Sequence, residues 1–356
     1  ATLDHSYPHC WRCSSPLLYM ARPSWYIQTT KLRDQLVELN ATIDWHPPEI
    51  GTGRFGEWLA NNVDWAISRE RYWGTPLNVW ICDGCGHERA PTSLEELGLP
   101  DDFDPHRPFI YDVTLTCDRC DGTLWRTPEV IDCWFDSGAI PFAQAGWPRA
   151  TDGELPEHHP GDFICEGLDQ TRGWFYTLHV ISTFLTGKPA YRSVLVNNLL
   201  LDGQGKKMSK SRGNVVDPWE VFETCGADAA RWSFISQGQV WLPKRFDLRN
   251  VTEGARRTFG TLRNCYAFLA LYANLDQWGP GDDAPALASR PAIDRWLVSR
   301  LQTLTETVGA AYEALDLQTV AARLDAFIDE ELSNWYVRRN RARFWKSGDD
   351  DDKRAA

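Results

Sequence analysis

The chain has 356 residues, with 37 basic and 49 acidic side chains and a formal net charge of −12 at pH 7. This length predicts two or three domains, each large enough to bury its own core. With 43% hydrophobic and 24% charged residues, the composition excludes a disordered or collagen-like chain. No apolar run approaches the roughly 18 residues of a membrane span, and we expect no secretory signal in the N-terminal residues given. Without a start Met, we expect the chain to begin inside a longer polypeptide.

Residues 1–76 contain short apolar runs separated by Gly and Pro, which is typical of a connective region. Trp65-Ala66-Ile67 is a plausible short strand within it. Residues 77–128 contain two C-x-x-C pairs, much Asp, Pro and Gly, and little periodicity, as in a small metal-stapled insert. The pairs supply four thiolates, the tetrahedral set that structural zinc prefers: Cys82, Cys85, Cys117 and Cys120. The gap between the pairs is longer than usual for such sites. A third pair, Cys10 and Cys13, has no partners in this sequence. Three such pairs suit a metal better than they suit disulfides, which is consistent with a reducing compartment.

A strand–helix–strand unit follows. Asp162–Cys165 is typical of a buried strand, and apolar residues then recur with helical spacing from Trp174 to Leu185. Ser193–Val196 is the second strand, and the connection predicts parallel strands. Ligands on such sheets bind beyond the carboxyl ends of the strands. That rule places four residues at the mouth of a site, namely Glu166, Gly167, Asp169 and Gln170.

The next segment, Lys207–Ser211, is a glycine-flanked basic loop. Lys207 and Lys210 can reach a polyphosphate and neutralise charge that develops on a leaving pyrophosphate. The alternative interpretation is a solvated basic turn.

Helices are predicted for the rest of the chain. Asp217 and Pro218 form a strong helix start, as cap and first helical residue. One helix face is marked by Leu324, Ile328, Leu332 and Trp335. The basic stretch after it, residues 338–346, mixes cations with aromatics and suits either an RNA-facing surface or a solvated helix face. The run Asp349–Lys353 is compatible with an appended tag or a native acidic linker.

Several motifs together resemble one family. Lys207–Ser211 matches the KMSKS signature of class I aminoacyl-tRNA synthetases. Three other segments resemble signatures of the isoleucyl-tRNA synthetases: E-G-L-D-Q-T-R-G-W-F at 166–175, D-C-W-F-D-S-G at 132–138 and S-R-E-R-Y-W-G-T-P at 68–76. Valyl- and leucyl-tRNA synthetases share KMSKS, but we do not expect the strings at 166–175 and 132–138 in them. On these motifs the chain is identified as a member of the isoleucyl-tRNA synthetase family.

The resemblance implies a role for each matching residue. Glu166 would contact the aminoacyl-adenylate and hold the substrate ammonium. Asp169 would accept from a ribose hydroxyl, although it could instead cap the helix near Thr171, and Gln170 would bind a second polar edge. The remaining roles concern the isoleucine pocket, lined by Trp134 and Trp174, and the ATP, contacted by Gly167, Met208 and the catalytic Lys207 and Lys210.

The resemblance also implies an α/β fold, the second half of a Rossmann-like class I catalytic domain with a zinc insert, followed by an α-helical anticodon-binding bundle. We expect the connective region and first Rossmann strand at 1–76, the zinc insert at 77–128, the catalytic half at 129–215, a stem-contact junction at 216–250 and a truncated helical domain at 251–356. The HIGH motif and the editing domain of the family are absent from the sequence. Cys10 and Cys13 would then be an orphan half-site, and we expect the chain alone to be inactive.

The expected enzyme is a cytoplasmic, monomeric isoleucine–tRNA ligase. Its partners would be tRNA(Ile), ATP and L-isoleucine, with Mg²⁺ accompanying ATP and zinc as the structural metal. Two rivals stay open at this stage. One is another class I ligase, such as the valine enzyme, and the other is a noncatalytic zinc-ribbon and helical RNA-binding module.

Overall fold

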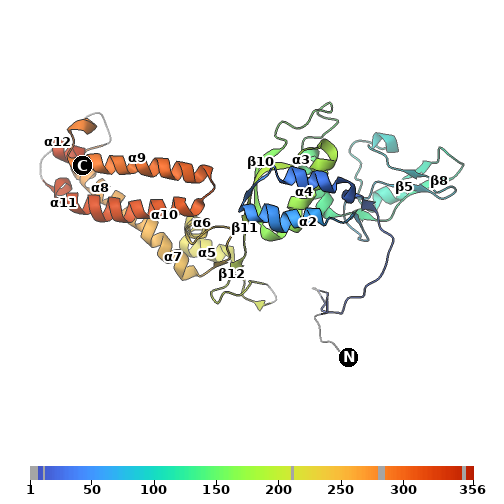
Figure 1. Ribbon diagram of the computed structural model, residues 1–356, viewed down its shortest axis with the longest axis horizontal. Coiled ribbons are helices and arrows are strands. Elements are labelled where there is room, and N and C mark those ends of the chain that lie inside the picture. Colours follow the sequence, from blue (N-terminus) through green and yellow to red (C-terminus); the bar gives the residue numbers. More distant parts are fainter. Residues whose placement is uncertain (1–6, 11–12, 210–211, 280–284, 347–349) are drawn as a thin grey trace. The chain divides into compact units, whose positions relative to one another are not determined.

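The computed structural model describes residues 7–10, 13–209, 212–279, 285–346 and 350–356 (Figure 1). The chain forms two compact units, each with contributions from distant parts of the sequence. The first unit comprises Ala1–Thr42, Arg54–Gly161 and Thr171–Tyr191, and the second comprises Ile43–Gly53, Asp162–Gln170 and Arg192–Ala356. In the described part of the chain, no helix is both long and apolar enough to cross a membrane.

The helical core of the first unit surrounds helix α4 (Trp174–Thr186). It also contains α1 (Arg33–Asn40), α2 (Gly56–Ala60) and α3 (Cys133–Ala143), and α3 packs along α4 (Figure 1). The sequence predicts an amphipathic α4, and this is wrong for most of its length, because residues 175–183 are all buried. Some polar side chains of this helix bond internally; the Tyr176 hydroxyl, for example, donates to Asn62 Oδ1 at 2.8 Å.

The first unit also contains small antiparallel sheets. β1 (Tyr26–Ile27) pairs with β3 (Trp65–Ala66), so the strand predicted at 65–67 is present. β4 (Ser68–Arg69) pairs with β9 (Val130–Ile131). A four-stranded sheet in the order β6-β5-β8-β7 has its own small core. Its strands are β5 (Trp80–Cys82), β6 (Glu88–Arg89), β7 (Thr114–Thr116) and β8 (Thr123–Arg126).

The second unit begins with a three-stranded sheet in the order β10-β11-β2. β10 (Gly161–Gly167) and β11 (Tyr191–Asn197) are the two predicted strands, each somewhat longer than expected. β2 (Asp44–His46) pairs with β11 in parallel, with Val194 opposite Trp45. Sequence reasoning missed β2 because three residues are too few to show a period.

Beyond the sheet, β12 (Leu200–Leu201) pairs with β13 (Lys244–Arg245) in parallel, and helices follow. Asp217 caps the first of them as predicted, because its side chain accepts from Trp219 N at 3.0 Å. The α-helices are α5 (Pro218–Cys225), α6 (Ala227–Ser236), α7 (Leu248–Ala255), α8 (Thr261–Leu275), α9 (Ala292–Glu313), α10 (Leu317–Ala326), α11 (Arg338–Trp345) and α12 (Asp351–Ala355). α9 and α10 lie side by side (Figure 1).

The sequence predicts one apolar helix face through Leu324, Ile328, Leu332 and Trp335. In the structure the buried face follows this pattern only as far as Ile328. A π-helical stretch, η9 (Phe327–Val337), connects α10 to α11. Because a π-helix has more residues per turn than an α-helix, the buried positions then move to Tyr336, Asn340 and Phe344. Trp335, expected on the buried face, is instead 47% exposed.

A buried histidine gives a test of this core. His179 on α4 is fully buried, and its Nε2 lies 2.9 Å from Leu36 O. Burial lowers its pKa from 6.5 to about 4. Since the unfolded chain binds a proton that the folded chain excludes, stability falls as the pH drops from about 6.5 to 4, by up to about 3 kcal/mol.

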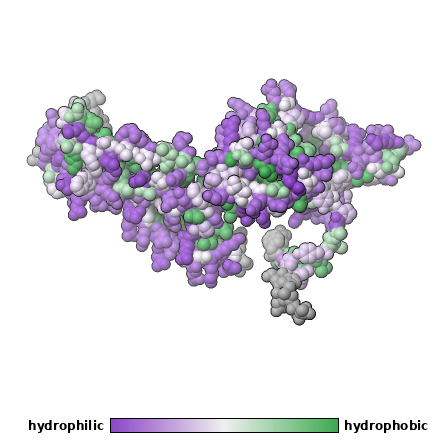
Figure 2. Space-filling view, viewed as in Figure 1, coloured by the Kyte–Doolittle hydropathy of each residue, from purple (hydrophilic) through white to green (hydrophobic). Residues whose placement is uncertain are grey.

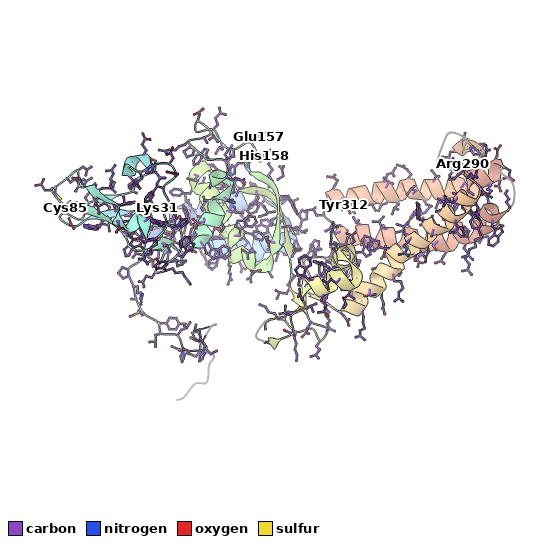
Figure 3. All side chains as sticks on the ribbon, turned by 180° about the vertical axis from the view of Figure 1, so that it is seen from behind. Lys31, Cys85, Glu157, His158, Arg290 and Tyr312 are labelled. Atoms are coloured by element: carbon purple, nitrogen blue, oxygen red, sulfur yellow. The ribbon has the colours of Figure 1, made fainter. Side chains whose placement is uncertain are left out.

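We predict that His179→Gln removes this pH dependence, measured as the urea-unfolding free energy at pH 6.5, 5.5 and 4.5. His158, which is exposed and labelled in Figure 3, provides the matched His158→Gln control, which should keep the dependence. Equal slopes in the two variants would show that other groups govern the acid response.

Candidate functional site

Four cysteines of the four-stranded sheet converge at one point. The sulfurs of Cys82, Cys85, Cys117 and Cys120 all lie within 4.8 Å of one another. The Cys82–Cys120 and Cys85–Cys117 sulfur distances are 3.5 and 3.7 Å. Tetrahedral zinc with Zn–S bonds of about 2.3 Å separates its sulfurs by about 3.8 Å, so the cluster has the dimensions of such a site. Figure 3 labels Cys85 beside the strands of this sheet.

The backbone around the cluster is shaped for sulfur ligands. Gly122 N donates to Cys120 Sγ at 3.3 Å, and Arg119 N donates to Cys117 Sγ at 3.4 Å. A Cβ on Gly122 would lie 2.7 Å from Cys82 Sγ, so only glycine fits there. The donor set and its surroundings therefore fit a metal ion such as zinc.

The thiols also show why a cation suits them. Hydrogen bonding from the backbone N–H of Cys85 contributes most to lowering the pKa of Cys82 to about 7. The Gly122 N–H lowers the pKa of Cys120, but contacts with the Cys82 and Cys85 thiols outweigh it and raise that pKa to about 12. Four adjacent thiolates repel one another, and a bound cation removes that repulsion.

The third pair lies elsewhere in the first unit. Cys10 and Cys13 are held by a small turn in which Cys10 N donates to Ser15 O at 2.8 Å. Hydrogen bonding with Ser15 lowers the pKa of Cys13 to about 7. Among the described residues, neither cysteine belongs to a group of three or more metal-ligating side chains.

The predicted mouth residues lie at the end of β10. Glu166 and Asp169 are exposed, and Gln170 is half-buried. Gln170 Nε2 donates to Asp169 Oδ2 at 2.9 Å. A Cβ on Gly167 would lie 2.7 Å from Asp169 Oδ1, so this glycine lets the carboxylate turn back toward the strand end. Asp169 does not cap α4, whose N-cap is Gly173 without a side-chain hydrogen bond.

The basic loop is held by two residues that sequence reasoning missed, Asp202 and Asn214. Asn214 Oδ1 accepts from Ser209 N at 2.9 Å, and its Nδ2 donates to Asp202 Oδ2 at 2.9 Å. Hydrogen bonds from Asn214 and from Lys206 N lower the pKa of Asp202 and keep it an acceptor. Only their hydrogen bonds reveal this role, because Asp and Asn are ordinary loop residues.

The two lysines and the methionine of that loop differ in their surroundings. The backbone of Lys207 forms an isolated antiparallel β-bridge with that of Leu201, and Lys207 is exposed. Met208 packs, partly buried, against an apolar cluster that includes Val221 and Val251. Lys210 lies outside the described residues.

The predicted pocket tryptophans lie in the first turns of two adjacent helices. Trp134 is the second residue of α3 and is 40% exposed, and Trp174 is the first residue of α4. The Trp174 indole donates to Ser137 O at 3.0 Å, which ties the start of α4 to α3. The two helices approach closely at Gly138, where a Cβ would lie 2.9 Å from Thr177 and Ile181 atoms.

Cys133, which lies outside the four-cysteine cluster, is exposed. It occupies the first position of α3 beside the capping Asp132, where the side chain faces outward.

The comparisons with known proteins agree with the motifs. Residues 14–241 match the family described as tRNA synthetases class I (I, L, M and V), and residues 294–356 match the anticodon-binding domain of tRNA ligase. The chain is 50% identical to an isoleucine–tRNA ligase of Thermus thermophilus over 99% of this chain and 34% of that protein. It is 48% identical to one of Clostridium acetobutylicum over 98% of this chain and 34% of that protein.

The chain therefore spans about a third of the length of these curated relatives. Among solved structures, a Mycobacterium tuberculosis methionyl-tRNA synthetase in complex with methionyl-adenylate has a similar fold, with a TM-score of 0.65 and 20% identity. That similarity covers 99% of this chain and 60% of the other.

The first prediction from the site concerns metal. We expect one zinc ion per purified chain, and Cys82→Ser should reduce the zinc content and lower the thermal midpoint, because structural zinc contributes folding free energy. Elemental analysis and thermal unfolding measure both. Cys133→Ser, an exposed cysteine outside the cluster, is the matched control and should change neither. A folded, zinc-free protein would contradict the prediction.

The second concerns the contact between α3 and α4. Gly138→Ala should destabilise the first unit by about 1–3 kcal/mol, because the added methyl overpacks the helix crossing. Gly309→Ala on α9, where an added Cβ meets nothing within 4 Å, is the control. It should be neutral or stabilise by up to about 1 kcal/mol. The free energy of unfolding in urea is measured for both variants and the parent. A Gly138→Ala variant as stable as the parent would show that the two helices can move apart without cost.

Proposed function

The chain belongs to the class I tRNA synthetases of the I, L, M and V group, and we propose that it is part of an isoleucine–tRNA ligase. The similarity to isoleucine–tRNA ligases over 99% of this chain carries the proposal. The motifs at 132–138 and 166–175, which we expect only in the isoleucine enzymes, support isoleucine over valine or leucine.

The proposed reaction is the two-step charging of tRNA. The isoleucine carboxylate attacks the α-phosphate of ATP, an isoleucyl–AMP bond forms, and pyrophosphate leaves; the isoleucyl group then passes to the terminal ribose of tRNA(Ile). We assign the substrate ammonium to Glu166 and the ribose to Asp169, with Gln170 on a second polar edge. Their support is their place at the end of β10, where ligands of such sheets bind.

We assign the charge of the leaving pyrophosphate to Lys207 and Lys210. No side-chain nucleophile is needed, because positioning and charge stabilisation suffice for phosphoryl chemistry. The hydrogen bond from Asn214 to Asp202, together with that from Ser209 N to Asn214, supports a positioning role for both residues in this loop. Mg²⁺, when bound with ATP, would neutralise phosphate charge.

The isoleucine side chain is assigned to Trp134 and Trp174. The bond from the Trp174 indole to Ser137 O supports this, because it orients one ring from the helix that carries the other. Zinc is assigned to the four-cysteine cluster in a structural role, since four protein ligands leave no open position for a substrate.

The helical part of the second unit is assigned to tRNA. On α11, Arg338, Arg339 and Arg341 are exposed, and Arg339 Cζ lies 4.3 Å from the centre of the exposed Trp335 ring. Arg343 is excluded from this surface because it forms an ion pair with the buried Asp294 at 2.7 Å. The visible face of these helices is largely hydrophilic, with scattered apolar patches (Figure 2).

We retain the domain boundaries of the sequence interpretation as proposals: 1–76, 77–128, 129–215, 216–250 and 251–356. The four-stranded sheet and its cysteines lie within 77–128, which supports that boundary pair. We also propose a monomer that works in the cytoplasm. All ten cysteines are free thiols, which suits a reducing compartment.

The proposal is tested by ATP–pyrophosphate exchange. A full-length protein carrying this sequence should exchange rapidly with isoleucine, weakly with valine and not measurably with leucine. The 356-residue chain alone should show no exchange, because we expect ATP to require contacts from both halves of the nucleotide fold. Faster exchange with valine than with isoleucine would overturn the assignment.

A single variant tests the role of the loop within that assay. Lys210→Ala in the full-length protein should lower kcat by at least about a hundredfold with isoleucine binding nearly unchanged, because the charge that it meets develops mainly in the transition state. Equal losses in binding and turnover would mean that Lys210 holds only ground-state ATP.

A further inference from the structure

The first unit carries an alternating column of rings and guanidinium groups that no role above uses. Arg126 Cζ lies 4.4 Å from the centre of the Tyr111 ring, and Arg107 Cζ lies 4.0 Å from the same ring. Arg107 Cζ also lies 5.2 Å from the Tyr72 ring. Tyr72 is the last ring of the column, and it is accessible to solvent, with 65% of the residue exposed.

A second stacked pair lies beside it in the sequence. The rings of Trp73 and His106 are 4.5 Å apart and nearly parallel, at 6°. Asp104 holds His106 in place, since its Oδ1 lies 2.7 Å from His106 Nδ1. Trp73 is 63% exposed, so neighbouring residues 72 and 73 both present aromatic rings to solvent, each supported from the segment 106–107.

A hollow of about 250 Å³ adjoins the Tyr72 end of the column. Its lining is mostly charged and comprises Glu70, Arg71, Tyr72, Arg107, Pro128 and Glu129. The Arg71 side chain makes no hydrogen bond or ion pair with any residue in the described ranges. One carboxylate oxygen of Glu129, Oε2, is buried, and within the described residues it has no hydrogen-bond partner.

We propose that this hollow binds an unpaired nucleobase of an RNA. An exposed ring supported by a guanidinium is a stacking platform for a flat base. Arg71 supplies donors for the adjoining phosphate, and Glu129 supplies an acceptor for an exocyclic amino group. The mostly charged lining disfavours a protein partner, whose buried interface core would be depleted of charge. The inference rests on the proposed function only for the identity of the RNA, which would then be the tRNA.

The acceptor at Glu129 implies a preference among bases. Adenine and cytosine carry exocyclic amino groups and uracil does not, so A and C should bind more tightly than U. Glu129→Gln should reduce this preference while leaving the stacking on Tyr72 in place.

The experiment uses the zinc-loaded chain and fluorescein-labelled hexamers of A, C and U, with binding followed by anisotropy at low salt. Tyr72→Ala should weaken binding of the A and C hexamers by about tenfold, and Tyr72→Phe should restore it, because one stacked base contributes that much. Tyr26→Ala removes another exposed tyrosine of the same unit, at 60% exposure, and should leave binding unchanged. A hexamer with one 5-iodocytidine should photo-crosslink to Tyr72 or Trp73.

Equal effects of Tyr72→Ala and Tyr26→Ala, or crosslinks confined to α11, would overturn the proposal. So would a failure of all three hexamers to bind, which would leave the hollow as a protein contact. The readout needs neither ATP nor isoleucine, so its failure is distinguishable from failure of the proposed ligase. Full-length Tyr72→Ala should keep isoleucine-dependent exchange, and loss of exchange in the unaltered protein would count against the ligase alone.

Discussion

The buried carboxylate of Asp132 joins α3 to β3 and β4 within the first unit. It is 4% exposed and accepts from Trp134 N at 3.2 Å, from the Trp65 indole at 3.2 Å and from Arg69 Nη2 at 2.5 Å. One side chain therefore caps α3 and joins it to two strands from residues 65–69. Because a buried carboxylate without partners is costly, these three donors must be in place whenever the unit is folded. The position of Trp134 depends on this arrangement.

Much of the fold could be predicted from the sequence, and the failures have physical causes. Strands β10 and β11, the cap at Asp217 and the pairing of the four cysteines depend on local patterns, and local patterns can be read directly. The burial of α4 depends on α1 and α3, which pack against it from distant parts of the chain. The spacing of apolar residues within α4 therefore predicted only one buried face, whereas most of the helix is buried. The π-helical stretch η9 shifts the buried face of a helix whose residues otherwise have an ordinary helical spacing.

The candidate site divides in the same way. Motif spacing identified the mouth residues, the lysines and the tryptophans, and the comparisons confirm the family. Their individual roles stay predictions. What the sequence could not show is the support around them: Asn214 bridging to Asp202, and Gly167 making room for the Asp169 carboxylate. These are contacts of common residue types across a turn, and they acquire meaning only from their geometry.

Charge pairing bears on the proposal that this acidic chain binds RNA. With a net charge of −12, the protein repels phosphates at long range, so binding must rely on cations that the fold leaves unneutralised. The fold neutralises some of them: Arg343 pairs with Asp294 and Asp352, and Lys346 pairs with Asp350 and Asp352 of the acidic C-terminal run. Asp350 and Asp352 therefore neutralise cations of the helical part while staying partly exposed. Two other cations, Arg339 on α11 and Arg107 beside Tyr72, lie next to exposed aromatic rings, where stacking can add to a weak electrostatic attraction. Recognition built this way is confined to defined places, which a uniformly basic surface would not achieve.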